Sequence, residues 1–443
     1  MDYRATIDWL FALQRFGIKL GLANVRALLA RLGDPQDRLP SAIVGGTNGK
    51  GSTATFLTRI ARAAGLRVGL YTSPHLQRFN ERIQVDGVEI TDDEVVRQTV
   101  EIRAALDEVN AERPEAERIA ITFFEFTTVM AVRHFLERGC GLGVFEVGMG
   151  GRLDATNAIP ALISVVTHVA MEHRAYLGDT IEAIAFEKAG IWKPGRLAVT
   201  GERKPEALAV LRRVAQERGT ALREWGRDFA TGGARKDGGF DYHGIGTTLA
   251  DLRLGLPGEH QVENAACALA AWELLAPALG RPIDERAMRA GVGERGFVGR
   301  LSRVREEPPV ILDVAHNPDA ADALVRYLEE ELVARGRRPV VLIGMMRDKD
   351  ARGALARLAR VANGVIVTRA RVADAVPPED LATVAREAGL ACEVAATVDE
   401  GMALLAARLD APGAAGLITG SFYVVGEAMD FLETHPEWPG RRR

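Results

Sequence analysis

The sequence predicts an α/β protein with two domains, each organised around a mostly parallel β-sheet. Its 443 residues exceed what one ordinary hydrophobic core supports, and this length indicates two or three domains. Short apolar runs of strand length alternate with segments whose apolar residues recur at helical spacing. The links between them are short, which is typical of parallel βαβ units.

Composition indicates a soluble globular protein. Apolar residues make up 47% and charged residues 26%, and 56 Lys and Arg balance 60 Asp and Glu for a formal net charge of -4. This balance provides no overall positive field, so neither nucleic acid nor an anionic membrane is expected as a partner. No apolar run approaches the roughly 18 residues of a transmembrane helix. Three widely separated cysteines, Cys140, Cys267 and Cys392, favour a reducing, cytoplasmic location.

The first part of the chain contains the elements of one α/β domain. Apolar residues alternate on either side of Asp86-Gly87 and predict a hairpin, and the segment 91–94 (TDDE) is a capping box that opens a long helix. The other predicted helices cover the opening residues up to 16 and residues 24–31, 51–64, 124–137 and 181–189. The predicted strands cover residues 41–46, 67–73, 142–147 and 161–169.

A boundary between the domains is expected near residue 296. Residues 231–248 are rich in Gly, Thr and charge and predict an exposed hairpin or loop, and residues 261–275 predict a helix rich in alanine. Glycines interrupt the periodicity in the segment 291–300, the best linker candidate. The α/β alternation then restarts with five short strands: PPVILDVA, RPVVLIGMM, NGVIVTRA, ACEVAATV and GLITGS. We therefore assign the domains to residues 1–296 and 297–443.

The sharpest local signal for chemistry is GGTNGKGS at residues 45–52, between a predicted strand and a predicted helix. Glycines let backbone N–H groups approach phosphate oxygens, and the helix N-terminus and Lys50 add positive charge. The loop departs from the common GxxxxGK[ST] pattern, because Val44 stands at the first glycine and Gly51 moves the hydroxyl to Ser52. The residues assigned to ATP here are Thr47, Asn48, Gly49, Lys50, Gly51 and Ser52.

GTNGKGS is also the form found in Mur-type ligases, and it is one of seven ordered segments that carry a family resemblance. The others are GIKLGL, YTSPHL, ITFFEF, FEVGMGGRLDATN, the stretch from MEHRAYLG to FEKAGI, and DVAHNPDA with IGMMRDKD and GSF. Together they span residues 17 to 423 and resemble the dihydrofolate/folylpolyglutamate synthases of the Mur ligase superfamily. The resemblance implies an N-terminal P-loop ATPase domain with pteroate-binding helices and a smaller, Rossmann-like C-terminal domain.

The resemblance also implies a magnesium centre. Ser73, Glu146 and His173 would hold Mg²⁺, and a carbamate on Lys188 would help to hold a second ion. Glu146 ends a predicted strand, where open α/β sheets place ligands, and Mg²⁺ favours oxygen ligands. Each residue taken alone also fits a structural role, and Lys188 fits an ordinary lysine beside Glu187. The family usually has Asp directly before the histidine that corresponds to His173, whereas this sequence has Glu172.

The resemblance also implies a pocket for the pteroate, the acceptor to which glutamate would be joined. Three segments would form this pocket. They are Ile18, Lys19 and Leu20; Thr122, Phe123, Phe124 and Glu125; and Leu153, Asp154 and Ala155. Phe124 has the chemistry to stack on a pterin ring, and Asp154 has the chemistry to bind its amino edge. Core packing is the alternative role for Phe123 and Phe124.

The remaining implied contacts lie later in the chain. By the resemblance, Asn264 would contact the adenine side of ATP, Arg300 would clamp a phosphate and Asp313 would bind the ribose. His316 and Ser421 resemble residues that engage glutamate or the transferring phosphate. Lys50, Lys188 and His316 are the candidate catalytic residues.

The function that the resemblance implies is an ATP-dependent ligase that is a monomer and uses one or two Mg²⁺ ions. It would add L-glutamate to dihydropteroate and to the tail of reduced folates through an acyl phosphate. A folylpolyglutamate synthase alone and a Mur-type ligase with another acceptor are the alternative enzymes. A nucleotide-binding switch is the alternative of a different class, and it would need no acceptor pocket.

Overall fold

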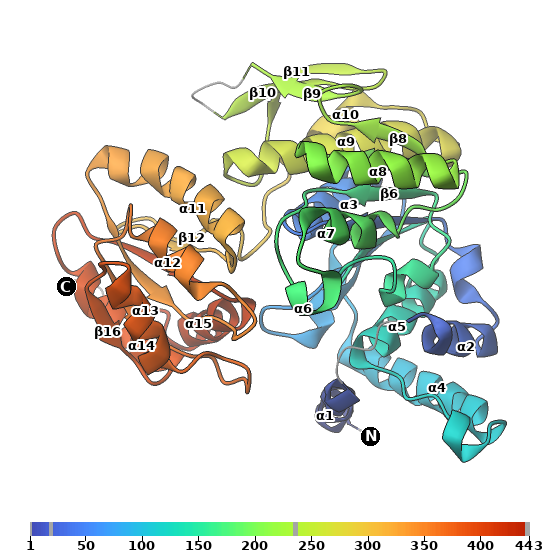
Figure 1. Cartoon of the computed structure of the whole chain (residues 1–443), viewed down its shortest axis with the longest axis horizontal. Helices are drawn as coiled ribbons and strands as arrows, with labels where there is room; N and C mark the ends of the chain where they lie inside the picture. The colour runs from blue at the N-terminus through green and yellow to red at the C-terminus, as the bar shows by residue number, and fades with distance from the viewer. Residues whose placement is uncertain (1, 17–20, 234–237, 439–443) are drawn as a thin grey trace. The chain divides into compact units, whose positions relative to one another are not determined.

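The structure is a computed structural model that describes residues 2–16, 21–233 and 238–438. The chain forms two compact units (Figure 1). The first comprises Met1–His75, Phe79–Gly255 and Gln261–Glu294, and the second comprises Leu76–Arg78, Leu256–His260 and Arg295–Arg443. The predicted boundary after residue 296 falls beside the start of the last of these segments. The two short segments that join the second unit were not predicted.

The first unit is built on an eight-stranded sheet in the order β4-β3-β2-β5-β1-β6-β7-β8. The strands are β1 (Ser41–Gly45), β2 (Val68–Tyr71), β3 (Ile83–Val85), β4 (Val88–Glu89), β5 (Leu142–Glu146), β6 (Ile163–Val166), β7 (Leu197–Thr200) and β8 (Ala221–Glu224). The six strands from β2 to β8 in this order run parallel, and β3 and β4 form an antiparallel hairpin at one edge. The predicted α/β class is confirmed. The predicted hairpin is present, with Asp86 at φ 54° and Gly87 at φ 84°.

Ten α-helices up to residue 294 accompany this sheet in the described part of the chain. They are α1 (Tyr3–Ala12), α2 (Ala23–Arg31), α3 (Lys50–Ala63), α4 (Asp92–Ala111), α5 (Phe123–Glu137), α6 (Arg174–Leu177), α7 (Ile181–Ala189), α8 (Pro205–Arg218), α9 (Glu259–Ala278) and α10 (Glu285–Gly293). Helix α3 packs on β1, β2 and β5, so the segment 45–52 lies between a central strand and a helix, as predicted. None of the described helices is long and apolar enough to cross a membrane.

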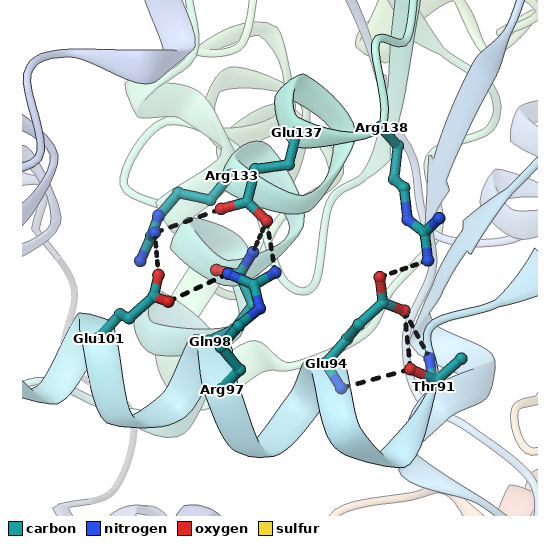
Figure 2. Close-up of polar contacts among 8 residues, drawn as sticks. All are labelled: Thr91, Glu94, Arg97, Gln98, Glu101, Arg133, Glu137 and Arg138. Carbon is teal, nitrogen blue, oxygen red and sulfur yellow. Dashed lines mark hydrogen bonds and ion pairs between the residues drawn. The ribbon is translucent and has the colours of Figure 1, made fainter.

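Helices α4 and α5 are held together by a network of charged side chains (Figure 2). Glu137 on α5 binds Arg97 on α4 at 2.6 Å, and Arg133 on α5 reaches Glu101 on α4. The predicted capping box is present, because the Thr91 hydroxyl accepts from the Glu94 N–H while the Glu94 carboxylate accepts from the Thr91 N–H. These contacts orient α5, whose N-terminus carries residues that are predicted to bind the pteroate acceptor.

Residues 230–232 and 239–253 contain a three-stranded antiparallel sheet, a more regular structure than the hairpin or loop predicted for residues 231–248. Its strands are β9 (Ala230–Gly232), β10 (Gly239–His243) and β11 (Thr248–Arg253), in the order β11-β10-β9. The Glu273 carboxylate on α9 accepts the N–H groups of Ile245 and Gly246, at 2.7 and 3.0 Å, and so holds the β10–β11 turn. Frequent Gly and charge in these strands hide the alternation by which a strand is predicted from sequence.

The second unit contains a six-stranded sheet in the order β12-β13-β17-β14-β15-β16. Its strands are β12 (Ser302–Arg305), β13 (Val310–Leu312), β14 (Pro339–Ile343), β15 (Gly364–Val367), β16 (Cys392–Val394) and β17 (Ala415–Thr419). Its helices are α11 (Pro318–Glu331), α12 (Ala351–Leu358), α13 (Pro378–Glu387), α14 (Val398–Leu409) and α15 (Phe422–Thr434). The five predicted strands are present and pair in parallel. The antiparallel edge strand β12 was not predicted, because SRVR is too polar to stand out as a strand.

Candidate active site

The loop between β1 and α3 follows a path that requires glycine at two positions. Gly46 has φ 143°, and a Cβ there would lie 2.0 Å from the Thr167 hydroxyl oxygen. Gly49, the N-cap of α3, has φ 84°, and a Cβ there would lie 2.2 Å from Asn264 Oδ1. Positive φ and these close approaches exclude larger side chains. The loop leads directly into a helix N-terminus, which is a favourable place for a phosphate.

This loop is anchored to the segment that follows β6. The Thr47 N–H donates to the His168 carbonyl at 2.6 Å, and the Ala170 N–H donates to the Thr47 hydroxyl at 3.0 Å. The Thr167 hydroxyl donates to the Asn48 carbonyl at 2.7 Å. Sequence reasoning did not single out Thr167. Its position near the carboxyl end of the predicted buried strand 161–169 is the signal that could have identified it.

The predicted adenine-side residue, Asn264, lies at this loop. It belongs to α9, and its side chain contacts Gly49 as described above. Its amide donates to Gln261 Oε1 at 3.0 Å, and its backbone carbonyl accepts the Thr53 hydroxyl at 3.4 Å. The fold therefore brings residues that are 215 positions apart, 49 and 264, into contact.

Two lysines and a glutamate come together beside the loop. Lys50 Nζ donates to the Thr47 carbonyl at 3.0 Å and is half-buried. Lys188 on α7 is 2% exposed, and burial lowers its pKa to about 7. The positive charge of Lys50 contributes to this lowering, while the negative charge of Glu172 opposes it. A buried amine with this pKa has a substantial neutral fraction near neutrality, as carbamate formation requires.

Two of the candidate metal ligands, Ser73 and Glu146, are joined by a hydrogen bond. Glu146 ends β5 and is buried, and its Oε2 accepts the Ser73 N–H at 3.1 Å. His173 is the N-cap of α6 at φ 49°, and its Nε2 lies 3.8 Å from Glu172 Oε1. Among the described residues no group of three or more His, Cys, Asp and Glu has the arrangement of a metal site. The Ser73 hydroxyl and the Glu146 carboxylate supply the oxygen ligands that Mg²⁺ favours, and Mg²⁺ retains several waters and needs few protein ligands. The imidazole of His173 is the less usual magnesium ligand of the three.

The segment 122–125 has clear structural roles. Thr122 and Glu125 form a second capping box: the Thr122 N–H donates to Glu125 Oε2 at 2.8 Å, and the Glu125 N–H donates to the Thr122 hydroxyl at 3.3 Å. Phe123 is buried and packs in the core, with its ring 5.6 Å from that of Phe11. Phe124 is half-buried, 5.7 Å from the Tyr71 ring. The role of these residues in acceptor binding stays a prediction.

Asp154 organises the loop that follows β5. Its Oδ2 accepts the N–H groups of Gly148 and Met149, both at 3.1 Å. Its Oδ1 accepts the Thr156 N–H at 3.0 Å and the Thr156 hydroxyl at 2.6 Å. Burial raises the pKa of Asp154 to about 6, against the effect of these hydrogen bonds. Leu153 and Ala155 flank it, and a direct contact of Asp154 with a pterin stays a prediction. The predicted residues Ile18, Lys19 and Leu20 lie outside the described residues.

In the second unit the predicted residues gather at the ends of β13 and β17. The Asp313 carboxylate accepts the N–H groups of Leu301 and Ala315, at 2.9 and 2.8 Å, and burial raises its pKa. The Arg300 guanidinium lies 5.1 Å from the Phe422 ring centre, and the His316 ring lies 6.0 Å from it. Ser421 caps α15 by accepting the Val424 N–H at 3.1 Å. Phe422 was not singled out from the sequence, although it belongs to the GSF segment.

Comparison with known proteins gives the family. The Mur ligase middle domain matches residues 44–272, and the Mur ligase glutamate ligase domain matches residues 299–422. Folylpolyglutamate synthase of Lacticaseibacillus casei is 34% identical over 438 residues, covering 98% of this chain and 99% of that protein. Dihydrofolate synthase/folylpolyglutamate synthase of Bacillus subtilis is 35% identical over 374 residues, covering 82% of this chain and 84% of that protein.

A solved structure agrees with these relatives. The structure described as E. coli FolC in complex with DHPP and ADP superimposes with a TM-score of 0.85 at 34% identity, covering 97% of this chain and 98% of that one. Sequence and fold therefore match over nearly the full length. The chain belongs to the Mur ligase family, among the dihydrofolate synthase/folylpolyglutamate synthases.

Proposed function

We infer that this protein is an ATP-dependent ligase that joins L-glutamate to dihydropteroate and to the glutamate tail of reduced folates. The observation that carries the inference is the glycine loop with Lys50 beside a buried Lys188 of lowered pKa, in a chain of this family. The B. subtilis relative is named for both activities, and the L. casei relative for folylpolyglutamate synthesis. The E. coli structure holds ADP and DHPP.

The first chemical step is the phosphorylation of the acceptor carboxylate by ATP. The backbone of residues 47–52 and Lys50 bind the phosphates and neutralise charge as the phosphoryl group moves to the carboxylate oxygen. Asn264, at the loop, is the adenine-side contact. Ser73, Glu146 and His173 would hold Mg²⁺, which supplies further charge neutralisation when bound. The glutamate amine then attacks the acyl carbon, and phosphate leaves.

Further roles follow for the other predicted residues. A carbamate on Lys188 would place an anion at a second Mg²⁺ position. In the second unit Arg300 clamps phosphate, Asp313 binds ribose, and His316 and Ser421 engage glutamate or the transferring phosphate. Loop 148–157 and the N-terminus of α5 bind the pteroate. A monomer in the cytoplasm, with no nucleic-acid or membrane partner, stays our prediction.

A phosphate-release assay tests this function. Release of inorganic phosphate from ATP is expected to require L-glutamate together with an acceptor, and dihydropteroate and tetrahydrofolate should each serve. A nucleotide-binding switch would release phosphate without either, or not at all. A Mur-type ligase with a different acceptor would use neither compound, and turnover on tetrahydrofolate but not on dihydropteroate would indicate folylpolyglutamate synthase only.

Removing a candidate metal ligand is expected to raise the magnesium requirement. Glu146→Gln and His173→Ala each should raise the Mg²⁺ concentration at half-maximal rate by about tenfold or more and lower kcat, because a hard cation loses a ligand. A magnesium titration at saturating ATP measures both effects. Glu224→Gln is the matched control, since Glu224 is also a buried carboxylate at a strand end but binds Arg212 and Arg227 instead. Titrations that overlay wild type would show that Glu146 and His173 are structural.

Truncating Phe124 is expected to affect dihydropteroate more than tetrahydrofolate. Loss of a stacking contact should cost about 1–3 kcal/mol, or roughly 5- to 150-fold in kcat/KM for dihydropteroate in Phe124→Ala. Phe124→Leu keeps an apolar side chain without a ring and serves as the comparison, with a smaller loss expected. Steady-state kinetics on both acceptors measure the difference. Equal losses on the two acceptors would instead indicate a shared pocket or a packing defect against Tyr71.

A further inference from the structure

The side chain of Asn157 joins two segments of the proposed site. It lies in the short helix η5 (Ala155–Ala158) and is 9% exposed. Its Nδ2 donates to the carbonyls of Arg152, at 2.8 Å, and Gly190, at 3.0 Å. Its Oδ1 accepts from Lys193 Nζ at 2.7 Å. Both N–H bonds of the amide are therefore used, and its oxygen binds a lysine.

The two segments that Asn157 joins are the loop 148–157 and the C-terminal end of α7. The Arg152 N–H also donates to the Glu187 carbonyl at 2.8 Å, and the Arg152 guanidinium binds the Glu187 carboxylate at 2.9 Å. A Cβ at Gly190 would lie 2.2 Å from the Cβ of Arg152, so the two segments pack without space for a side chain. The loop carries Asp154, and α7 carries Lys188 two residues before Gly190.

Lys193 holds Asn157 from the other side. Its Nζ donates to both the Oδ1 and the backbone carbonyl of Asn157, each at 2.7 Å. Burial and the positive charges of Arg26 and Arg218 lower the pKa of Lys193 to about 7. A neutral amine keeps two N–H bonds, which match the two acceptors, so the contact persists whether or not the extra proton is bound. Arg218 Nη1 in turn donates to the carbonyls of Gly190 and Trp192, at 3.0 and 2.6 Å.

We propose that Asn157, held by Lys193, is a positioning residue that fixes the acceptor-side loop 148–157 to the helix that bears Lys188. The proposal rests on the proposed function, because it assigns the loop to the acceptor and Lys188 to the reaction centre. Displacement of reacting groups by about 1 Å can cost on the order of 100-fold in rate, so this connection has kinetic consequences. In the sequence, nothing distinguishes Asn157 from its neighbours in the segment RLDATN, residues 152–157.

Kinetics and hydrogen exchange on the full-length protein test this role. Asn157→Ala and Lys193→Met are each expected to lower kcat/KM for the acceptor by about tenfold or more, with the KM for ATP within about twofold of wild type. The double variant should lose little more than Asn157→Ala, because Lys193 acts through Asn157. Lys193→Arg, which keeps a cationic donor, should recover part of the loss.

Asn110→Ala is the matched control. Asn110 likewise joins two segments through its amide, since its Nδ2 donates to the Ile119 carbonyl at 3.1 Å and its Oδ1 accepts the Ile119 N–H at 2.8 Å. It lies at the end of α4, outside the proposed site, so its loss should lower stability and leave the KM of the folded protein unchanged. All rates are measured well below each variant's melting temperature.

Amide hydrogen exchange supplies a readout that does not depend on turnover. Exchange at Arg152 and across loop 148–157 should accelerate in Asn157→Ala and in Lys193→Met, while the β1 and β5 amides stay protected. Unchanged exchange in this loop together with wild-type kinetics would overturn the proposal, as would additive losses in the double variant. If the wild type fails to glutamylate any pteroate or folate, the proposed function fails, and the exchange result still decides whether Asn157 fixes the loop.

Discussion

Lys50→Ala is expected to lose ligase turnover by about 100- to 1,000-fold or more while the protein stays folded. Lys50 brings a full positive charge to the glycine loop, and removal of one well-placed charge or donor at a transition state has effects of this size. Its Nζ makes a single hydrogen bond to the loop itself, at the Thr47 carbonyl, within the described part of the chain. The core therefore loses little when the side chain is truncated.

Activity and thermal melting of Lys50→Ala should be measured on the same preparation. Arg97→Ala provides the control, because Arg97 is an exposed cation in the network between α4 and α5 (Figure 2) and has no place in the proposed site. The control should keep wild-type kcat. Retained turnover in Lys50→Ala with an unchanged melting temperature would contradict the assignment of the loop to phosphate.

Lys188→Met is expected to lower kcat by about 100-fold or more, because the variant cannot form the proposed carbamate anion. In wild type, carbon-13 NMR with labelled bicarbonate at mildly alkaline pH should detect the carbamate, which acid would destroy. A short carboxylate added to the smaller variant Lys188→Ala should restore part of the activity. A bare ammonium on Lys188 in a complex with Mg²⁺ and ATP would contradict the role.

The same lysine has a pH signature in stability. Its pKa is lowered in the folded state from 10.5 to about 7, so between these values the unfolded chain binds more protons than the folded one. In buffers free of CO₂ the free energy of unfolding should therefore gain a contribution that grows from about pH 7 to pH 10.5. Lys188→Met should lack this contribution, and chemical denaturation of both proteins across that range measures it.

Much of the fold could be predicted because local patterns and tertiary packing agree. The central strands of both sheets are buried on both faces, so they are continuous apolar runs that stand out in the sequence. The predicted capping box at Thr91 and the predicted Asp86-Gly87 hairpin depend on neighbouring residues alone. The edge strand β12 and the sheet β9–β11 are polar and partly exposed, so their pairing partners had to come from the folded structure.

The candidate site was predictable in part for the same reason. The glycine loop and Lys188 lie in segments whose family resemblance is local in sequence, and the structure places them near one another. Asn157 gains its importance from Gly190 and Lys193, which lie more than thirty positions away, and the contact of Thr167 with Asn48 crosses 119 positions. Hydrogen bonds between residues so far apart in the sequence produce no local pattern from which they could be predicted.

The most direct test is incorporation of labelled L-glutamate by the wild-type protein, with dihydropteroate and with tetrahydrofolate in parallel assays containing ATP and Mg²⁺. We expect both acceptors to gain glutamate, with one ATP converted to ADP and phosphate for each amide bond formed. Incorporation into tetrahydrofolate alone would reduce the function to folylpolyglutamate synthesis. Incorporation into neither acceptor, by a folded protein that binds ATP, would contradict the proposed function.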